Sequence, residues 1–147
     1  MATYTIDSTV KDEATTEISD IMETNVITVE RKTPILDAIK TLVKYNFTGL
    51  PVIDKKGHVV GIVTEKDVLA LALSIHDKTY DSNTAAATVE DFMTPEVVTI
   101  DVNESLKQIC TSLMKHHFRR IPIVSNSKLV GIVSRKDIIA YIMKIKP

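Results

Sequence analysis

Two short stretches of the chain combine an apolar run, a hydroxyl and a carboxylate in the same order. Residues 61–67 read Gly-Ile-Val-Thr-Glu-Lys-Asp, and residues 131–137 read Gly-Ile-Val-Ser-Arg-Lys-Asp. Each pattern predicts a short apolar strand that passes through a polar turn into an amphipathic helix. A helix N-terminus presents unpaired backbone N–H groups and the positive end of a dipole, and both favour anions. The spacing therefore predicts two related anion-binding positions.

The hydroxyl and the carboxylate of each stretch also fit a structural role. Thr64 with Asp67, and Ser134 with Asp137, match a helix capping box, and a good N-cap contributes about 0.5–2 kcal/mol. Asp is shorter than the Glu that is usual in this motif, and its carboxylate can accept hydrogen bonds from two ribose hydroxyls. Capping and binding can coexist. We interpret the pair as ligand-binding because it occurs twice inside a longer repeat.

That repeat spans most of the chain. Asp-x-Met at residues 20–22 returns at residues 91–93, and a short helical start is predicted around each copy. A strand, a helix, two strands joined by a turn and a final helix follow in both halves, which gives the order β-α-β-β-α twice. The strands are predicted at residues 26–29, 50–53 and 59–63 in the first half, and at residues 97–100, 121–124 and 129–133 in the second.

The helix between the first and second strands of each half carries an apolar stripe, which predicts that it packs on the core. Thr33 is the predicted N-cap of the first of these helices, and Pro34 is its first helical residue. The predicted stripes are Ile35, Leu36, Ile39, Leu42 and Val43 in the first half, and Leu106, Ile109, Cys110, Leu113 and Met114 in the second.

Composition limits the class of protein. The 147 residues carry a net charge of -1 and a single cysteine, so neither a general attraction to nucleic acid nor an internal disulfide is expected. Because no secretory signal and no apolar run of roughly 20 residues occurs, we expect a cytoplasmic protein without membrane spans. No His or Cys spacing predicts a metal site, and no nucleophile with a base and an orienting acid predicts an enzyme.

The motifs taken in order resemble the cystathionine β-synthase (CBS) domain pair, or Bateman module, over about residues 18–143. The resemblance implies an α+β fold in which two pseudo-twofold-related β-α-β-β-α repeats pack sheet to sheet. The expected division is a flexible arm at residues 1–16, a first repeat at 17–76, a connector at 77–88 and a second repeat at 89–147.

The resemblance also implies a function, which is regulation through an adenosine derivative bound in clefts between the repeats. The ligand would be AMP, ADP, ATP or a related adenosyl compound such as S-adenosylmethionine; whether Mg²⁺ accompanies it is left open. The first cleft would comprise Met22, Ile27, Phe47, Thr48, Arg120, Ser134, Arg135 and Asp137, and the second Met93, Val98, Phe118, Arg119, Gly49, Thr64 and Asp67. In this assignment Asp67 and Asp137 bind the ribose. A homodimer, parallel or antiparallel, and a separate regulated protein are implied as partners.

The basic pair Arg119-Arg120 has no counterpart in the first half, where Thr48-Gly49 stands. Arg suits bidentate contact with phosphate, so we expect the first cleft to bind the more highly charged ligand, and to bind it more tightly. The alternative is that the two arginines are an exposed, solvated pair that contributes little to stability or binding.

Two other functions stay open at this point. The module could be free of ligand and act through its dimer surfaces. Nucleic-acid binding is the weakest hypothesis, because it rests only on the cations Arg119, Arg120, Arg135 and Lys136.

Overall fold

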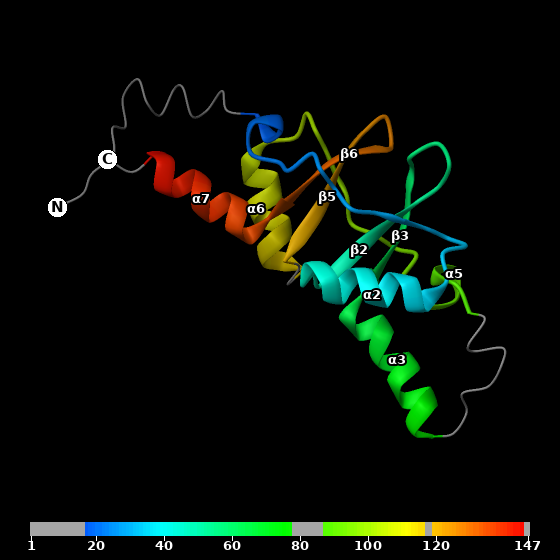
Figure 1. Cartoon of the computed structure of the whole chain (residues 1–147). Coiled ribbons are helices and arrows are strands. Elements are labelled where there is room, and N and C mark those ends of the chain that lie inside the picture. Colours follow the sequence, from blue (N-terminus) through cyan, green and yellow to red (C-terminus); the bar gives the residue numbers. More distant parts are fainter. Residues whose placement is uncertain (1–16, 78–86, 117–118, 146–147) are drawn as a thin grey trace. The chain divides into compact units, whose positions relative to one another are not determined.

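The computed structural model describes residues 17–77, 87–116 and 119–145 (Figure 1). The predicted arm at residues 1–16 and most of the predicted connector at residues 77–88 lie outside this range. The first half contains η1 (Ile18–Asp20), β1 (Val29–Glu30), α2 (Ile35–Tyr45), β2 (Gly49–Ile53), β3 (Val59–Thr64) and α3 (Glu65–His76). The second half contains α5 (Val89–Phe92), β4 (Ile100–Asp101), α6 (Leu106–Lys115), β5 (Arg120–Ser125), β6 (Lys128–Ser134) and α7 (Arg135–Ile145).

The strands form two three-stranded sheets of the same topology, with the orders β1-β2-β3 and β4-β5-β6. In each sheet the first pair of strands is parallel and the second pair is antiparallel. The α+β class and the twofold β-α-β-β-α order predicted from the sequence are therefore confirmed.

The first strand of each sheet is shorter than predicted. The expected strands at residues 26–29 and 97–100 are present only as Val29–Glu30 and Ile100–Asp101. Val29 pairs with Val52 in the parallel ladder, and the preceding residue of β2 is Pro51. Because proline has no backbone N–H to donate, the ladder cannot extend in that direction; Pro122 has the same position in β5.

The predicted start of α2 was wrong by one residue, because Pro34 rather than Thr33 is the N-cap. The hydroxyl of Thr33 accepts from the backbone N–H of Glu30 (3.1 Å), and its carbonyl accepts from the N–H of Val89 (2.8 Å). The hydroxyl of Thr33 thus closes the turn before α2, and its carbonyl binds the first residue of α5.

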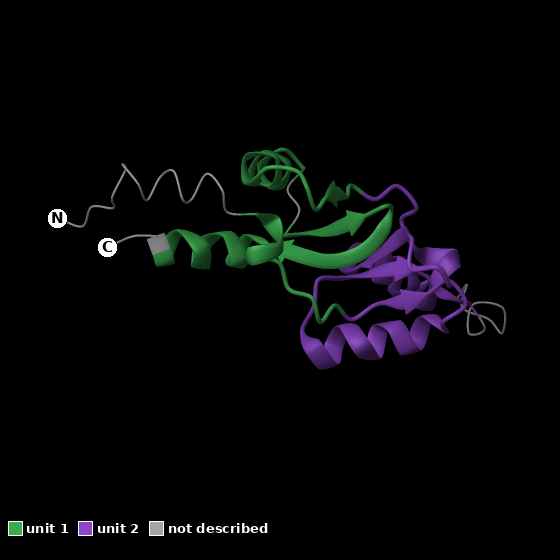
Figure 2. Cartoon of the chain, turned by 90° about the horizontal axis from the view of Figure 1, so that it is seen from above, with its two compact units in different colours: residues 1–26, 98–147 green, residues 27–97 purple. Residues whose placement is uncertain are grey.

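The chain divides into two compact units that do not coincide with the two halves of the sequence (Figure 2). Unit 2 is residues 27–97, and unit 1 is residues 1–26 together with 98–147. The leading segment of each half thus belongs to the unit that holds the sheet of the other half. Glu23 bridges Ile132 in β6 through two backbone hydrogen bonds of 2.9 Å, and Thr94 bridges Ile62 in β3 with bonds of 2.8 and 2.9 Å.

Each unit has its own apolar core. In unit 2 it is centred on Leu50, Val52 and Val63, and the leading-segment residue Val89 is fully buried among them. Unit 1 repeats the arrangement, with Ile18 as the buried residue of the leading segment. Since burying such an aliphatic side chain contributes about 1.5–3 kcal/mol, the leading segments are integral parts of the two cores.

The buried faces of the helices α2 and α6 are narrower than the predicted stripes. In α2 the buried residues are Ile35, Ala38 and Leu42, whereas Leu36 and Val43 are exposed. In α6 the stripe residue Met114 is likewise exposed, although Ile109 and Leu113 are buried. The stripe prediction was thus correct for the inner residues and wrong for these outer ones, because only about one helical face contacts each sheet.

Candidate functional site

The junction between β3 and α3 in unit 2 is closed by a capping box. The backbone N–H of Thr64 donates to Asp67 Oδ2 (2.7 Å), and the Thr64 hydroxyl lies 3.0 Å from the same oxygen. In return the N–H of Asp67 donates to Thr64 Oγ1 (3.4 Å). The predicted structural role of the pair is confirmed. The hydrogen bonds of the capping box engage Oδ2 of Asp67, which is one of its two carboxylate oxygens.

The junction between β6 and α7 in unit 1 has the same geometry. The N–H of Ser134 donates to Asp137 Oδ2 (2.8 Å), and the N–H of Asp137 donates to Ser134 Oγ (3.1 Å). Both aspartates are half-buried and lie at the start of a helix of more than ten residues. Each combines a fixed carboxylate with the N–H groups of a helix terminus, an arrangement that suits a ligand with hydroxyl and anionic groups.

The second carboxylate oxygen distinguishes the two junctions. In unit 2, Oδ1 of Asp67 accepts a hydrogen bond from the Thr94 hydroxyl (3.1 Å). The residue that bridges β6 in unit 1 at the place of Thr94 is Glu23, whose side chain ends in a carboxyl group and not in a hydroxyl. Asp137 therefore lacks the equivalent of the Thr94 hydrogen bond, and its Oδ1 is the better placed of the two to accept hydrogen bonds from a ligand.

Arginine lies beside only one of the junctions. Arg120 is directly opposite Ser134 in the β5–β6 ladder, and the carbonyl of Arg119 accepts from the N–H of Arg135 (3.0 Å). In unit 2 the ladder places Gly49 opposite Thr64. Unit 1 thus brings three arginines to the start of α7, where the charge favours a phosphate group.

The Asp-x-Met and Gly-Ile-Val motifs of opposite halves meet in each unit. A Cβ added to Gly61 would lie 2.6 Å from Met93 Sδ and 3.1 Å from the Thr94 carbonyl oxygen. At Gly131 it would overlap Met22 Sδ and lie 3.0 Å from the Glu23 oxygen. The glycines are therefore required by the close approach of the leading segment, and the methionines have a packing role.

The members of each predicted cleft are divided between the two units. Unit 1 contains Met22, Val98, Arg119, Arg120, Ser134, Arg135 and Asp137, and unit 2 contains Ile27, Phe47, Thr48, Gly49, Thr64, Asp67 and Met93. Phe118 lies outside the described residues. Ile27, Phe47 and Met93 pack against the core of unit 2, and the ring of Phe47 stacks on that of Tyr45 with centroids 5.4 Å apart. The composition of the clefts stays a prediction.

Sequence reasoning missed Thr94 and Glu23. The available signal was the mismatch directly after the matched Asp-x-Met motifs, where one copy has Glu and the other Thr. It also missed a cavity of about 390 Å³ beside Asp137, which Asp20, Tyr141 and Lys144 help to line.

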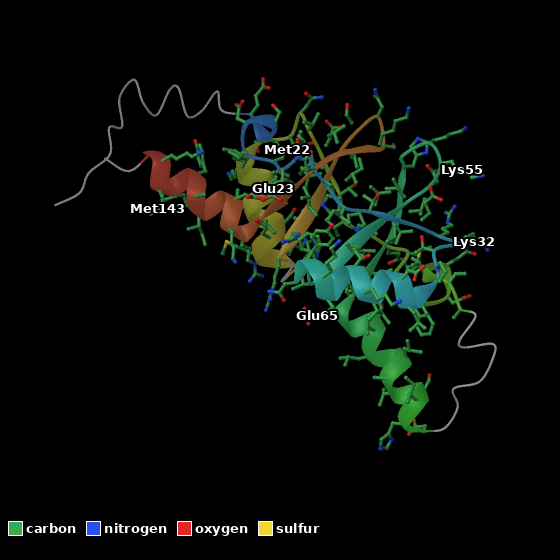
Figure 3. All side chains as sticks on the ribbon, in the orientation of Figure 1. Met22, Glu23, Lys32, Lys55, Glu65 and Met143 are labelled. Atoms are coloured by element: carbon green, nitrogen blue, oxygen red, sulfur yellow. The ribbon has the colours of Figure 1, made fainter. Side chains whose placement is uncertain are left out.

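A second charged region surrounds the β2–β3 turn of unit 2, where a cavity of about 570 Å³ is lined by basic residues together with the acidic Glu30, Asp54 and Glu90. Two of the basic residues, Lys32 and Lys55, are labelled in Figure 3. Asp54 pins this turn by accepting from the N–H groups of Lys56 and His58, both at 2.9 Å. The hydrogen bond from the His58 N–H is the main cause that lowers the pKa of Asp54 below its ordinary value.

Two kinds of feature are absent from the part of the chain that the structure describes. Within residues 17–77, 87–116 and 119–145, no group of three or more His, Cys, Asp or Glu side chains could hold a metal ion. No helix in these ranges is both long and apolar enough to cross a membrane.

Comparison with known proteins shows what the chain resembles. The family model of the CBS domain matches residues 18–74 and 89–144. Among curated relatives, the uncharacterized protein MJ1225 of Methanocaldococcus jannaschii is 34% identical over 83% of this chain and 41% of its own length. The L-aspartate semialdehyde sulfurtransferase of the same organism is 32% identical over 84% of this chain and 22% of its own length. The chain thus spans less than half of either relative.

Two solved structures match over nearly their whole length. CBSX2 in complex with AMP has a TM-score of 0.76 and 32% identity, covering 88% of this chain and 97% of that one. The domain pair of protein MJ0100 in complex with 5'-methylthioadenosine and S-adenosyl-L-methionine has a TM-score of 0.69 and 29% identity, again covering 88% and 97%.

Proposed function

The chain belongs to the CBS domain family, and on this premise we propose that it is a regulatory module that binds an adenosine-containing ligand at its two strand-to-helix junctions. The observation that carries the proposal is the pair of aspartates fixed at helix starts, of which Asp137 has Arg120 beside it across the ladder. The bound AMP of CBSX2 and the adenosyl ligands of MJ0100 support this ligand class.

We assign the roles by chemistry. Asp137 accepts hydrogen bonds from the ribose hydroxyls, while the N-terminus of α7 and the guanidinium of Arg120 bind the phosphates. Asp67 and Thr64 have the same roles at the start of α3, where the ladder places Gly49 in the position that corresponds to Arg120.

The proposed output is regulatory and not catalytic. A ligand shifts a conformational equilibrium only by the difference in its affinity for the two states, so the ligand must favour one arrangement of the module. That arrangement acts on a separate protein, and the module works as a homodimer. The presence of a matching segment in a sulfurtransferase supports a regulated partner of this kind.

The experiment compares Asp137→Asn with Asp91→Asn by titration calorimetry with AMP, ADP, ATP and S-adenosylmethionine. Asn keeps one carbonyl oxygen to accept from the N–H of Ser134, so the cap is largely preserved. Asp91 is the matched control, because its Oδ2 accepts from the N–H of Thr88 at 2.8 Å in a third capping box outside both proposed sites.

We expect Asp137→Asn to lower affinity at least about tenfold, since hydrogen bonds to a charged group contribute roughly 1.5–3 kcal/mol, and Asp91→Asn to leave affinity unchanged. The two variants should melt at similar temperatures. Saturating ligand, at about 100 times its dissociation constant, should add roughly 2.7 kcal/mol to the apparent stability of the wild type. If no adenosyl ligand raises the melting temperature, the alternative of a ligand-free interaction module gains support. The observation that favours it is the exposure of large apolar side chains on the helices, among them Val43, Leu69 and Met114.

A further inference from the structure

The cavity at the β2–β3 turn lies at the end of the sheet of unit 2 that is far from the start of α3. In the β2–β3 ladder, Gly49 pairs with Thr64 at one end and Ile53 pairs with Val59 at the other. Because a strand rises roughly 3.3 Å per residue, β2 separates the two ends by about 13 Å. The described residues that line the cavity all belong to unit 2. A partner bound here would therefore leave the start of α3 open to a ligand.

Basic side chains reach this cavity from two loops. Arg31 and Lys32 follow β1, and Lys55 and Lys56 belong to the turn between β2 and β3. All four residues are exposed. Lys32 and Lys55 lie on the same side of unit 2 (Figure 3). Two separate loops thus contribute positive charge to one cavity.

The acidic residue of the turn does not neutralise its lysines. Asp54 Oδ1 accepts from the N–H groups of Lys56 and His58, and Asp54 Oδ2 lies 3.1 Å from His58 Nδ1. Both carboxylate oxygens are thus engaged within the turn. Among the described residues, neither Lys55 nor Lys56 forms an ion pair. Their ammonium groups are therefore available to a partner.

Unit 1 forms the same turn without this cluster of cations. Both antiparallel ladders have a register shift just before the turn. Unit 1 has Val102 and Asn103 in the loop after β4, where unit 2 has an arginine and a lysine. The turn at residues 125–128 contains a single lysine. Because the repeated fold does not require these cations, we look to binding for their role.

The other acidic groups of the cavity limit the kind of anion that fits. Glu30 and Glu90 also line it, and the Glu90 carboxylate lies 3.9 Å from Arg31 Nε and 3.8 Å from Lys32 Nζ. A nucleic acid carries a charged phosphate at every step of its backbone, and these glutamates would repel it. A peptide can instead place separate carboxylates beside the lysines and neutral or basic side chains beside the glutamates. The mixed lining therefore favours an acidic peptide segment.

We propose that this cavity binds an acidic segment of the regulated protein, with carboxylates of the segment beside Lys55 and Lys56. The inference rests on the proposed function in one respect, which is that a separate regulated protein exists. Exposed complementary charges influence the association rate and the choice of partner more than the affinity. Such contacts suit a module that binds and releases its target.

The test measures binding of a fluorescein-labelled hexaglutamate peptide to the full chain by fluorescence anisotropy at low salt. We expect Lys55→Gln combined with Lys56→Gln to weaken binding roughly threefold to tenfold, since each exposed ion pair contributes little by itself. The hydrogen bond from Lys56 to Asp54 comes from the backbone N–H and is retained. Added salt should weaken binding by the wild type, because it screens exposed charges.

The matched control is Lys107→Gln combined with Lys115→Gln. It removes two exposed lysines from α6 in unit 1, so the change in net charge is the same. Binding of hexaglutamate should stay close to that of the wild type. Equal losses in the two double variants would show that the peptide responds only to the overall charge of the chain, and would overturn the inference.

Two further probes can overturn it. Hexaglutamine with the same label should bind more weakly than hexaglutamate, and equal binding would show that the chain does not select carboxylates. A single-stranded thymidine oligonucleotide should not depend on Lys55 and Lys56. If it binds more tightly than hexaglutamate and loses this binding in the variant of the turn, the cavity is a nucleic-acid site and the acidic segment is wrong.

Calorimetry with AMP separates this inference from the ligand-binding function. The variant of Lys55 and Lys56 should bind AMP as the wild type does, because neither lysine belongs to a proposed cleft. A wild type that binds hexaglutamate through these lysines but no adenosyl ligand supports the acidic-segment site and refutes ligand binding. A wild type that binds AMP but not hexaglutamate overturns the acidic-segment site alone.

Discussion

The start of α3 and the start of α7 share one backbone geometry and differ in the groups available to a ligand. Both junctions have the capping box, and both have a glycine pressed against a methionine. At α3 the second oxygen of Asp67 is occupied by Thr94, whereas at α7 the second oxygen of Asp137 lacks that donor and Arg120 stands across the ladder. We call the capping box and the glycine–methionine contact the shared frame of the two junctions. Both features serve folding and occur in both units, whereas the residues beside them that could contact a ligand differ.

The largest expected effect concerns the shared frame. Gly131→Ala and Gly61→Ala should each lower the free energy of unfolding by about 1–3 kcal/mol, because the new methyl group overpacks a tight contact. The Glu23 and Thr94 carbonyl oxygens, 3.0 and 3.1 Å from the added Cβ, belong to the backbone and cannot swing aside. Urea denaturation measures the loss.

A double variant identifies the contact. Met22→Ala combined with Gly131→Ala should be less destabilised than the sum of the two single changes, since removing the thioether makes room for the methyl group. Additive losses of unfolding free energy would show that Met22 does not restrict position 131. If only one of Gly131→Ala and Gly61→Ala were strongly destabilised, the two junctions would not share this contact.

The next largest effect concerns Arg120, which makes the junction at α7 more positively charged than the junction at α3. Arg120→Ala should reduce ATP affinity by roughly tenfold to a hundredfold, the range for a lost hydrogen bond to a charged group. It should reduce AMP affinity less, because AMP has fewer charged oxygens. Arg31→Ala is the comparison and should change little, because this arginine lies beside Glu90 and belongs to neither proposed cleft. Calorimetry that finds equal affinities at the two sites of the wild type, or tighter binding after Arg120→Ala, contradicts the asymmetry.

A smaller effect is expected at Thr94. Thr94→Val removes the hydroxyl that donates to Asp67 Oδ1, so a ribose no longer competes with an internal hydrogen bond. Affinity at the Asp67 site should rise roughly twofold to tenfold, as one neutral hydrogen bond contributes about 0.5–1.5 kcal/mol. Thr111→Val is the matched control, because that hydroxyl donates only to the Lys107 carbonyl within α6. Weaker binding by Thr94→Val would instead make Thr94 a ligand-binding residue.

The smallest effect lies at the β-turns. The pKa of Asp54 is lowered in the folded chain, so its contribution to stability is complete above the unfolded pKa of about 3.8 and is lost as the pH falls through the folded value. Asp54→Asn keeps an acceptor for the turn but cannot titrate. The difference in unfolding free energy between wild type and variant should be constant near neutral pH and shrink below about pH 4. A difference in unfolding free energy that grows in acid would contradict the assignment to Asp54. The corresponding turn at residues 125–128 has no acidic residue, so it contributes no such pH dependence.

Much of the fold follows from local pattern. Alternating and helical periodicity located β2, β3, β5 and β6 to within a residue or two, because those strands consist of apolar runs ended by turn residues. The capping boxes were equally visible, since a cap depends on residues three apart in the sequence. The strands β1 and β4 were predicted too long because their length depends on Pro51 and Pro122 in a neighbouring strand.

The sequence by itself determined the repeat, the two helix starts with their hydroxyl and carboxylate, and the place of the arginine pair in the second copy. Only the tertiary structure decided which leading segment packs on which sheet, because that exchange between halves depends on contacts of residues far apart in the sequence. Thr94 contacts Ile62, 32 positions away, and Glu23 contacts Ile132, 109 positions away. The same exchange brings Thr94 to Asp67 and leaves Glu23 at the corresponding place in unit 1. Local propensity carries no information about such a partner, because the two possible pairings use nearly the same apolar residues.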